Sequence, residues 1–180
     1  MAEPHVDDSA LIEGTLAGRQ QDFETLVERY QKMLYAFAYR QLQDADAADD
    51  VVQATFVHAY AALARFRGEA SFKTWVYQIA LNECRAVYRA RRAQRVVPLD
   101  EVPESALPQV EPRSRLDRAA LEPLIHQLPP RQRAVLTLRV FSDLPFKEIA
   151  RVEGISENSA KVNYHHAVVR LKQWLTPTTS

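Results

Sequence analysis

The sequence is poor in several residue types. It has one cysteine, Cys84, and four glycines in 180 residues. A single cysteine excludes a disulfide scaffold and a cysteine-based zinc site, so we expect Cys84 to be a small buried side chain. Few glycines beside ten prolines argue against many tight strand turns. The composition therefore favours helices and a linker, and apolar residues at 47% are enough for real cores.

Targeting and membrane signals are also missing. The first ten residues, MAEPHVDDSA, lack the basic and apolar regions of a signal peptide. No run approaches the roughly 20 apolar residues needed to span a bilayer. We therefore expect a cytoplasmic protein.

The formal net charge is zero, but the charges are unevenly distributed. Residues 44–50 carry four aspartates and no base, whereas residues 85–95 carry five arginines and no acid. Residues 131–175 hold eight bases and four acids. This distribution predicts two partners of opposite sign, and the basic C-terminal segment suits nucleic acid.

Prolines mark a boundary within the chain. Pro98, Pro103, Pro108 and Pro112 recur every four or five residues among acids. No helix tolerates that spacing, so we predict an extended tether of roughly 20 residues, or else a spacer with no contacts of its own. The predicted organisation is an N-terminal domain over 1–94, a linker over 95–116 and a C-terminal domain over 117–180.

Before the tether, apolar residues recur at helical spacing. They predict a short helix near Leu11 to Leu16, a long one from Phe23 to Leu42, a third from Val51 to Leu63 after an acidic turn at 43–46, and a fourth from Phe72 to Arg92. Residues 66–71 are predicted to form a loop. The expected fold class is all-α, with a four-helix N-terminal domain.

Residues 145–175 have the pattern of two helices joined by a tight turn. Gly154 can supply the left-handed residue that ends the first helix, Ile155 can fill the corner, and Ser156 can cap the second helix. A buried stripe would leave five side chains on the opposite face: Asn158, Lys161, Val162, His165 and His166. This form suits a DNA major groove, although a helical hairpin whose polar face meets only water is an alternative.

Two longer strings carry a family resemblance. The first is DDVVQATFVHAYAALARFRGEASFKTWVYQIALNECRAVYRARR at 49–92, and the second is LPPRQRAVLTLRVFSDLPFKEIARVEGISENSAKVNYHHAVVRLKQWL at 128–175. They resemble, in order, the promoter-opening part and the C-terminal domain of bacterial sigma-70 family factors of the extracytoplasmic function (ECF) group. Residues 11–30 resemble that group's opening helix.

The resemblance implies a promoter-specificity factor for core RNA polymerase, with no catalytic residues and no cofactor or metal of its own. It implies a polymerase-binding set of Asp49, Asp50, Val52, Gln53 and Phe56 on the third helix. Acids around an apolar centre suit a basic partner helix.

The resemblance also implies that the loop and the fourth helix hold the single-stranded minus 10 element. Phe66, Arg67, Ser71 and Phe72 would line a pocket for a flipped base and Asn82 would read it, while Arg85, Arg89, Arg91 and Arg92 would follow the backbone. Trp75, Tyr77, Ile79 and Tyr88 are expected in the core.

The C-terminal helices would then read the minus 35 element as duplex. The implied set is Asn158, Ser159, Lys161, Val162, His165, His166 and Arg170, with Lys161 donating to guanine and Val162 touching thymine methyls. Asn163 and Val168 depart from the family, which usually has arginine at both places.

A further departure is Ala54, where the family usually has an acid. Phosphorylation of the neighbouring Thr55 by a Ser/Thr kinase would add about 1.5 to 2 negative charges, so Thr55 is a candidate switch. The alternative is that Thr55 packs in the helix. Regulation by an anti-sigma factor is the commoner arrangement in the family.

Two other function classes remain as alternatives. A polymerase-independent helix-turn-helix repressor would bind duplex alone as a dimer, but no helix shows the sustained heptads of a dimerising segment. A metal-dependent nuclease, or a metal site of Asp46, Asp49, Asp50 and His58, would require ligands that converge.

Overall fold

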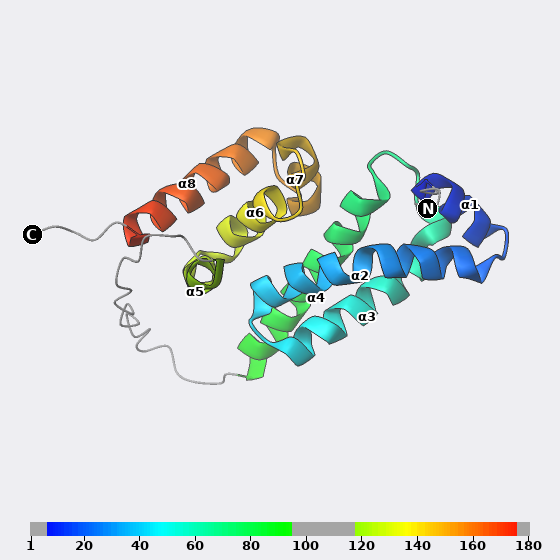
Figure 1. The fold of residues 1–180 in the computed structure, drawn as a ribbon, viewed down its shortest axis with the longest axis horizontal. Helices are drawn as coiled ribbons and strands as arrows, with labels where there is room; N and C mark the ends of the chain where they lie inside the picture. The colour runs from blue at the N-terminus through cyan, green and yellow to red at the C-terminus, as the bar shows by residue number, and fades with distance from the viewer. Residues whose placement is uncertain (1–6, 95–117, 176–180) are drawn as a thin grey trace, which may run out of the picture.

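The computed structural model describes residues 7–94 and 118–175, and in both ranges the regular structure is helical (Figure 1). The all-α prediction is confirmed. The predicted linker lies outside the described residues. Within the described ranges, no helix is long and apolar enough to cross a membrane.

The N-terminal segment contains four α-helices. They are α1 (Asp8–Leu16), α2 (Gln20–Leu42), α3 (Ala45–Ala62) and α4 (Phe72–Gln94), with a short 3-10 turn at Leu63–Arg65. The helix α3 begins earlier than predicted because Asp44 caps it, accepting a hydrogen bond of 3.0 Å from the Ala47 amide. Asp46 therefore lies in the first helical turn instead of in the predicted acidic turn.

The C-terminal segment adds four more helices. They are α5 (Arg118–Gln127), α6 (Pro130–Val140), α7 (Phe146–Glu153) and α8 (Glu157–Leu175). The predicted helix pair is α7 and α8. The Ser156 hydroxyl accepts a hydrogen bond of 3.0 Å from the Ser159 amide, which confirms the predicted cap. Gly154 has a φ of 69°, the left-handed conformation that ends α7 without strain.

Buried aromatic and aliphatic side chains hold the N-terminal helices together. Phe37 and Tyr77 meet edge to face with ring centroids 5.3 Å apart, joining α2 to α4. Cys84 is fully buried as predicted, and burial raises the pKa of its thiol to about 12. Of the residues expected in the core, Tyr77 is buried, whereas Trp75, Ile79 and Tyr88 are only partly buried.

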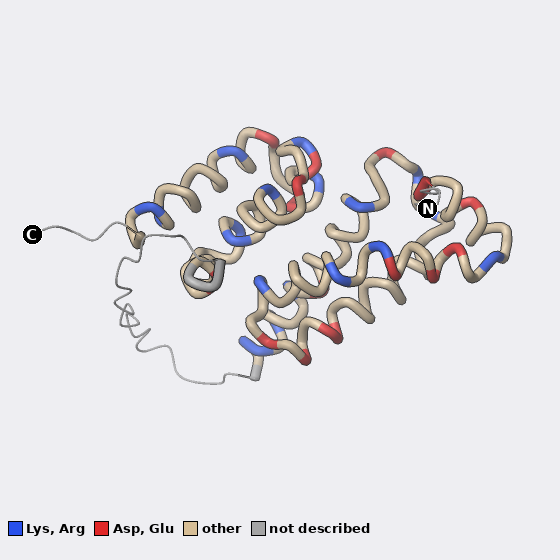
Figure 2. Tube along the Cα trace, viewed as in Figure 1, with Lys and Arg blue, Asp and Glu red and all other residues tan. Residues whose placement is uncertain are grey.

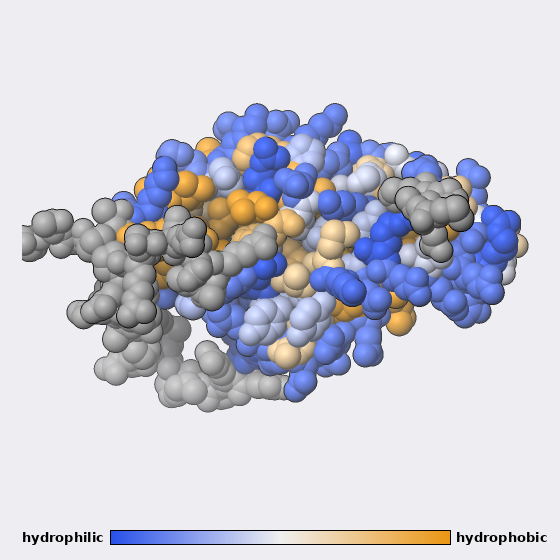
Figure 3. Space-filling view, in the orientation of Figure 1, coloured by the Kyte–Doolittle hydropathy of each residue, from blue (hydrophilic) through white to orange (hydrophobic). Residues whose placement is uncertain are grey.

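The two segments pack against each other, with α7 on α4 and α6 on α2 (Figure 1). Their buried residues form one continuous cluster, in which Val76 and Leu81 of α4 lie with Ile149 and Val152 of α7. In the space-filling view, apolar side chains gather over the C-terminal helices near α6 and α8 (Figure 3). This packing places α7 beside α4, the helix that carries the predicted minus 10 residues.

Candidate nucleic-acid and polymerase interfaces

Exposed acids follow one side of α3 (Figure 2). Asp46, Asp49, Asp50 and Gln53 are all exposed, and their spacing places them on one helical face. That face continues with two exposed apolar side chains, Val57 at 66% and Tyr60 at 54% exposure. We call these six residues the α3 face. It combines negative charge with apolar area, as the sequence predicts for a surface that meets a basic helix.

Two residues of the predicted polymerase-binding set lie elsewhere. Phe56 is buried and packs edge to face on Phe23, with ring centroids 6.3 Å apart. Val52 is half-buried against the core. The expectation that Phe56 is presented to a partner is therefore wrong, because the helical period turns it inward. The exposure of Val57 and Tyr60 on this face was not predicted, although their helical spacing from Gln53 and Asp49 indicates it.

The candidate switch Thr55 has no exposed surface. Its hydroxyl donates a hydrogen bond of 2.7 Å to the Val51 carbonyl in the preceding turn. A kinase could reach this hydroxyl only after α3 separated from the core. The structure thus contradicts an accessible phosphorylation site at Thr55 and agrees with the alternative that it packs in the helix.

Among the described residues, no group of three or more His, Cys, Asp and Glu side chains is arranged to hold a metal ion. His58, a ligand of the alternative metal site, instead lies 2.9 Å from the Glu83 carboxylate.

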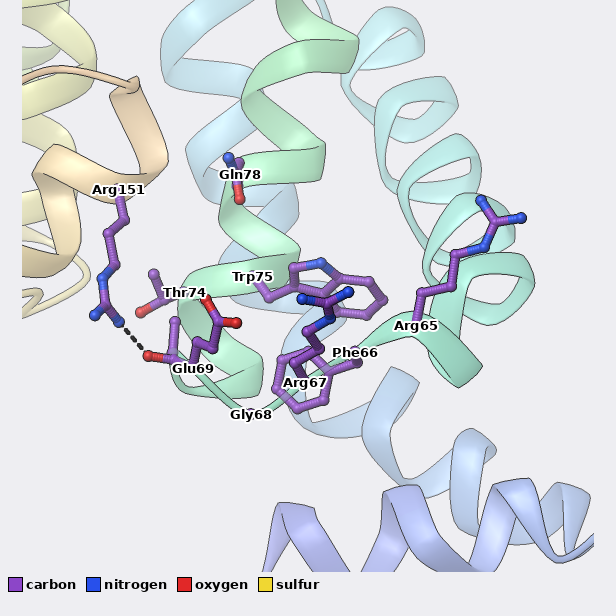
Figure 4. A pocket seen from close by; sticks show the side chains of 10 residues that line it. Arg65, Phe66, Arg67, Gly68, Glu69, Thr74, Trp75, Gln78 and Arg151 are labelled. Carbon is purple, nitrogen blue, oxygen red and sulfur yellow. Dashed lines mark hydrogen bonds between the residues drawn. The ribbon is translucent and has the colours of Figure 1, made fainter.

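The loop before α4 lines a pocket of about 490 Å³ (Figure 4). Phe66 and Arg67 line it as predicted, together with Trp75 and Gln78 of α4. The Phe66 and Trp75 rings lie 5.0 Å apart, which provides an aromatic wall on which a base could stack. Across the pocket, Arg151 of α7 donates a hydrogen bond to the Glu69 carbonyl (Figure 4).

Phe72 and Ser71 are not in that wall. Phe72 is buried beneath it, with its ring 5.8 Å from Trp75 and 5.6 Å from Tyr30. With Phe66 and Ser71 it lines a neighbouring pocket on the other side of the loop, so the role of these residues in holding a base stays a prediction. Ser71 is exposed and caps α4, accepting a hydrogen bond of 3.1 Å from the Thr74 amide. Trp75, which we expected in the core, is partly buried and lines the first pocket beside Phe66.

Four predicted DNA-binding residues share one face of α4. Asn82, Arg89 and Arg92 are exposed, and Arg85 is half-buried at the edge. Their spacing of three and four residues places them in line, and we call them the α4 strip. Arg91 points to the other side, where its guanidinium lies 2.6 Å from Asp44 and 3.3 Å from the Leu42 carbonyl. Arg91 is therefore engaged by α2 and by the turn before α3, and its contact with the DNA backbone stays a prediction.

Arg85 is engaged by the C-terminal segment. Its guanidinium donates a hydrogen bond of 2.6 Å to Glu153, whose side chain has 0% exposure. Burial raises the pKa of the Glu153 carboxyl, although Arg85 and Arg131 oppose the shift. A buried carboxylate is costly without a cationic partner, so this contact fixes Arg85 against α7.

The predicted minus 35 residues lie together on α8. Asn158, Lys161, Val162, His165 and His166 are exposed on one face, and Arg170 is exposed beside it. We call this the α8 face. Ser159 is half-buried at the first turn. Lys161 forms an exposed ion pair of 2.8 Å with Glu157, which holds the lysine loosely and leaves it available to a base or phosphate.

The two departures on α8 have structural explanations. Asn163 donates a side-chain hydrogen bond of 2.8 Å to the Ser159 carbonyl, and Val168 packs against the cluster formed by α5, α6 and α8. Both residues are half-buried, and by the helical period they flank the α8 face. Their side chains therefore make contacts within the C-terminal segment.

The arrangement is that of a helical DNA-binding protein that also carries a separate acidic surface on α3. Family comparisons agree: residues 26–95 match Sigma-70 region 2 and residues 118–171 match Sigma-70, region 4. The chain is 35% identical over 158 residues to the RNA polymerase sigma-H factor of Pseudomonas aeruginosa, covering 81% of each chain. It is 33% identical over 165 residues to the ECF RNA polymerase sigma-E factor of Haemophilus influenzae, covering 84% of this chain and 86% of that one.

Solved structures show the same fold. CnrH in complex with the cytosolic domain of CnrY matches with a TM-score of 0.73 and 28% identity, over 96% of this chain and 99% of that one. RpoE in complex with the anti-sigma factor NepR, from Bartonella quintana, matches with a TM-score of 0.68 and 24% identity, over 88% and 99%. The chain belongs to the sigma-70 family, in the ECF group of RNA polymerase sigma factors.

Proposed function

We propose that this chain binds core RNA polymerase through the α3 face and directs initiation at promoters that carry its minus 35 and minus 10 elements. The observation that carries this proposal is the separation of charge. Acids lie on α3, whereas α4 and α8 carry bases (Figure 2). The exposed apolar side chains Val57 and Tyr60 also lie on α3. One surface thus suits a basic protein helix, and two suit nucleic acid.

The two DNA surfaces are suited to different forms of DNA. The α8 face is a straight, exposed helical surface with donors, a methyl-contacting valine and imidazoles, which suits the edges of stacked base pairs in a major groove. The α4 strip follows a pocket with an aromatic wall, which suits a flipped base and the backbone of a single strand. We therefore assign minus 35 duplex to α8 and the opened minus 10 strand to α4.

The factor supplies specificity to the polymerase and needs no catalytic residues of its own. The proposed place of action is the cytoplasm, where bacterial transcription occurs. The division into a domain over 1–94, a linker over 95–116 and a domain over 117–180 is part of the proposal and is supported by the positions of the two family matches. An anti-sigma factor is the proposed regulator, as RpoE of Bartonella quintana is bound by one.

The test is co-elution with bacterial core RNA polymerase in gel filtration. We expect the wild-type chain to co-elute and the Asp49→Lys/Asp50→Lys variant to elute separately, because the variant reverses the charge of the α3 face. The matched control is Glu24→Lys/Glu28→Lys, which makes the same charge change at exposed positions of α2. Co-elution of both variants, or of none of the three proteins while all are folded, would overturn the assignment of the α3 face.

A further inference from the structure

A second cavity lies between the end of α4, the turn before α3 and the helices α5 and α6 (Figure 1). Its volume is about 690 Å³, which is within the range of small-molecule sites in proteins. We call it the basic pocket, and the proposed function assigns no role to the α5 and α6 residues in it. Its charged and aromatic lining residues are Asp44, Tyr88, Arg91, Arg92, His126 and Arg133.

The positive charge in the basic pocket is not balanced. Three guanidinium groups line it, and among the described lining residues Asp44 is the one carboxylate. Asp44 is already engaged, because one of its oxygens lies 2.6 Å from Arg91 and the other caps α3. The exposed Arg92 and the buried Arg133 are therefore left without an acid in the pocket. Such a concave basic surface favours an anion.

Arg133 is the buried cation of this pocket, with 6% exposure. Its terminal nitrogens donate to four neutral acceptors, which are the carbonyls of Gln41, His126 and Leu128 and the hydroxyl of Tyr88. Its Nε–H is buried and has no hydrogen-bond partner among the described residues. Burial lowers the pKa of this guanidinium, as expected for a cation without a counter-charge. The charge of Arg133 is therefore solvated by dipoles but not neutralised.

His126 experiences the same excess of positive charge. Its Nδ1 is buried and has no hydrogen-bond partner among the described residues. Burial and the neighbouring Arg133 both lower the pKa of the imidazole. The basic pocket thus combines two buried groups that have unused hydrogen-bonding capacity with the exposed guanidinium of Arg92.

We propose that the basic pocket binds a small phosphorylated molecule with a diphosphate or longer phosphate group. Guanidinium groups pair with phosphate oxygens through charge-assisted, often bidentate hydrogen bonds. Arg92 would contact one phosphate at the surface, whereas Arg133 and His126 would stabilise another from the interior. A DNA backbone has the same phosphate chemistry, but a strand along the α4 strip reaches Arg92 from outside, and Arg133 is buried between the helices. The proposal does not depend on the proposed function.

The test is calorimetric titration of the full chain with pyrophosphate at low ionic strength. We expect binding to be at least roughly tenfold weaker in Arg91→Gln/Arg92→Gln, because charge-assisted contacts are lost with two of the guanidinium groups. Both side chains reach the surface, so the variant should fold, which thermal unfolding checks.

The matched control is Arg65→Gln/Arg67→Gln. It makes the same charge change at two exposed residues that line the pocket of Phe66 and Trp75. We expect this control to bind pyrophosphate as wild type does. A loss in the control as large as in the Arg91→Gln/Arg92→Gln variant, or no binding by wild type, would overturn the proposal.

A second measurement locates the ligand in the wild-type chain. Nuclear magnetic resonance of the His126 ring against pH gives its pKa with and without saturating pyrophosphate, and the His126→Gln spectrum identifies the signal. We expect pyrophosphate to raise this pKa, because a nearby anion stabilises the imidazolium. An unchanged His126 pKa at saturation would overturn the proposal even where calorimetry detects binding, since the anion would then lie elsewhere.

A third measurement separates a free phosphorylated molecule from a DNA backbone. The same His126 titration is repeated with a short single-stranded DNA pool of random sequence that lacks terminal phosphates. We expect the strand to leave the His126 pKa where it is in the free chain. A response to the strand as large as the response to pyrophosphate would make the basic pocket part of the DNA surface and overturn the proposal. Co-elution with core polymerase is scored separately, so the two proposals can fail independently.

Discussion

The helices α4 and α8 both carry residues that we assign to DNA binding, but these residues differ in their contacts with the rest of the protein. On α8 the face is exposed, and Lys161 is held only by an ion pair within the same helix. On α4 the strip is exposed at Asn82 and Arg89, but Arg85 is tied to a buried carboxylate of the other segment. The comparison shows that all the residues of a binding surface can be present in the sequence while one of them, here Arg85, is engaged by another part of the folded chain.

The largest effect is expected from the loss of Arg133, whose side chain links α6 to α2 and α4. The substitution Arg133→Ala leaves the buried Gln41 and Leu128 carbonyls, and the partly buried His126 carbonyl, without its hydrogen bonds. We expect the free energy of unfolding in denaturant titrations to fall by about 3 kcal/mol. The control Arg131→Ala, at a largely exposed side chain, should cost under about 1 kcal/mol. Equal losses in the two variants would contradict the account.

On the α8 side, Lys161→Ala should weaken binding of the polymerase complex to its cognate minus 35 duplex by about 1 to 3 kcal/mol. The lysine is exposed at the centre of the face, so its loss should not change stability or co-elution with core polymerase. The measurement is a promoter-binding titration, with Lys32→Ala on α2 as the control. An unchanged promoter affinity for Lys161→Ala would remove Lys161 from the reading surface.

Within α4, Arg89 and Arg91 are expected to differ in their contribution to single-stranded DNA binding. Arg89→Ala should remove one phosphate contact and lower the salt dependence of single-stranded DNA binding by about 0.7 in the slope of log affinity against log salt. Arg91→Ala should leave that slope unchanged and cost about 0.2 to 1 kcal/mol of stability, since its ion pair with Asp44 is well exposed. The measurements are salt titrations and thermal unfolding. A reversed pattern would place Arg91, and not Arg89, on the DNA.

The smallest effect concerns pH. Burial raises the pKa of Glu153 above its ordinary value of 4.5, so the folded form binds this proton more tightly than the unfolded form. The resulting stability is present below 4.5 and is lost as pH rises through the raised value. Glu153→Gln should remove this part of the slope of stability against pH, measured by denaturant titrations at several pH values. The same slope in wild type and Glu153→Gln would contradict a raised pKa at this site.

Much of this fold could be predicted from the sequence. Helical periodicity identified the four N-terminal helices, and Gly154 with Ser156 identified the turn before α8. The same period predicted the exposed side of α8. The prediction was possible because α8 packs one face, with Ala167 and Leu171, against α5 and α6 and leaves the opposite face exposed. Periodicity was less informative at Phe56 and Phe72, where an aromatic side chain suits either a buried core or a binding pocket.

Contacts between distant segments could not be predicted. A run of arginines in 85–95 indicates a basic surface, but nothing in the run shows that Arg91 turns back to Asp44 or that Arg85 meets Glu153. Arg151 was missed for the same reason, since it reaches the pocket loop from a helix 82 positions away in sequence. Such pairs depend on tertiary packing, which local patterns do not encode.

The most direct test of the account is to sequence the 5′ ends of transcripts made from fragmented genomic DNA by bacterial core RNA polymerase with the purified chain. We expect discrete start sites, each preceded by the same two DNA elements at minus 35 and minus 10. Transcripts indistinguishable from those of core polymerase alone, from a chain shown to be folded, would contradict it.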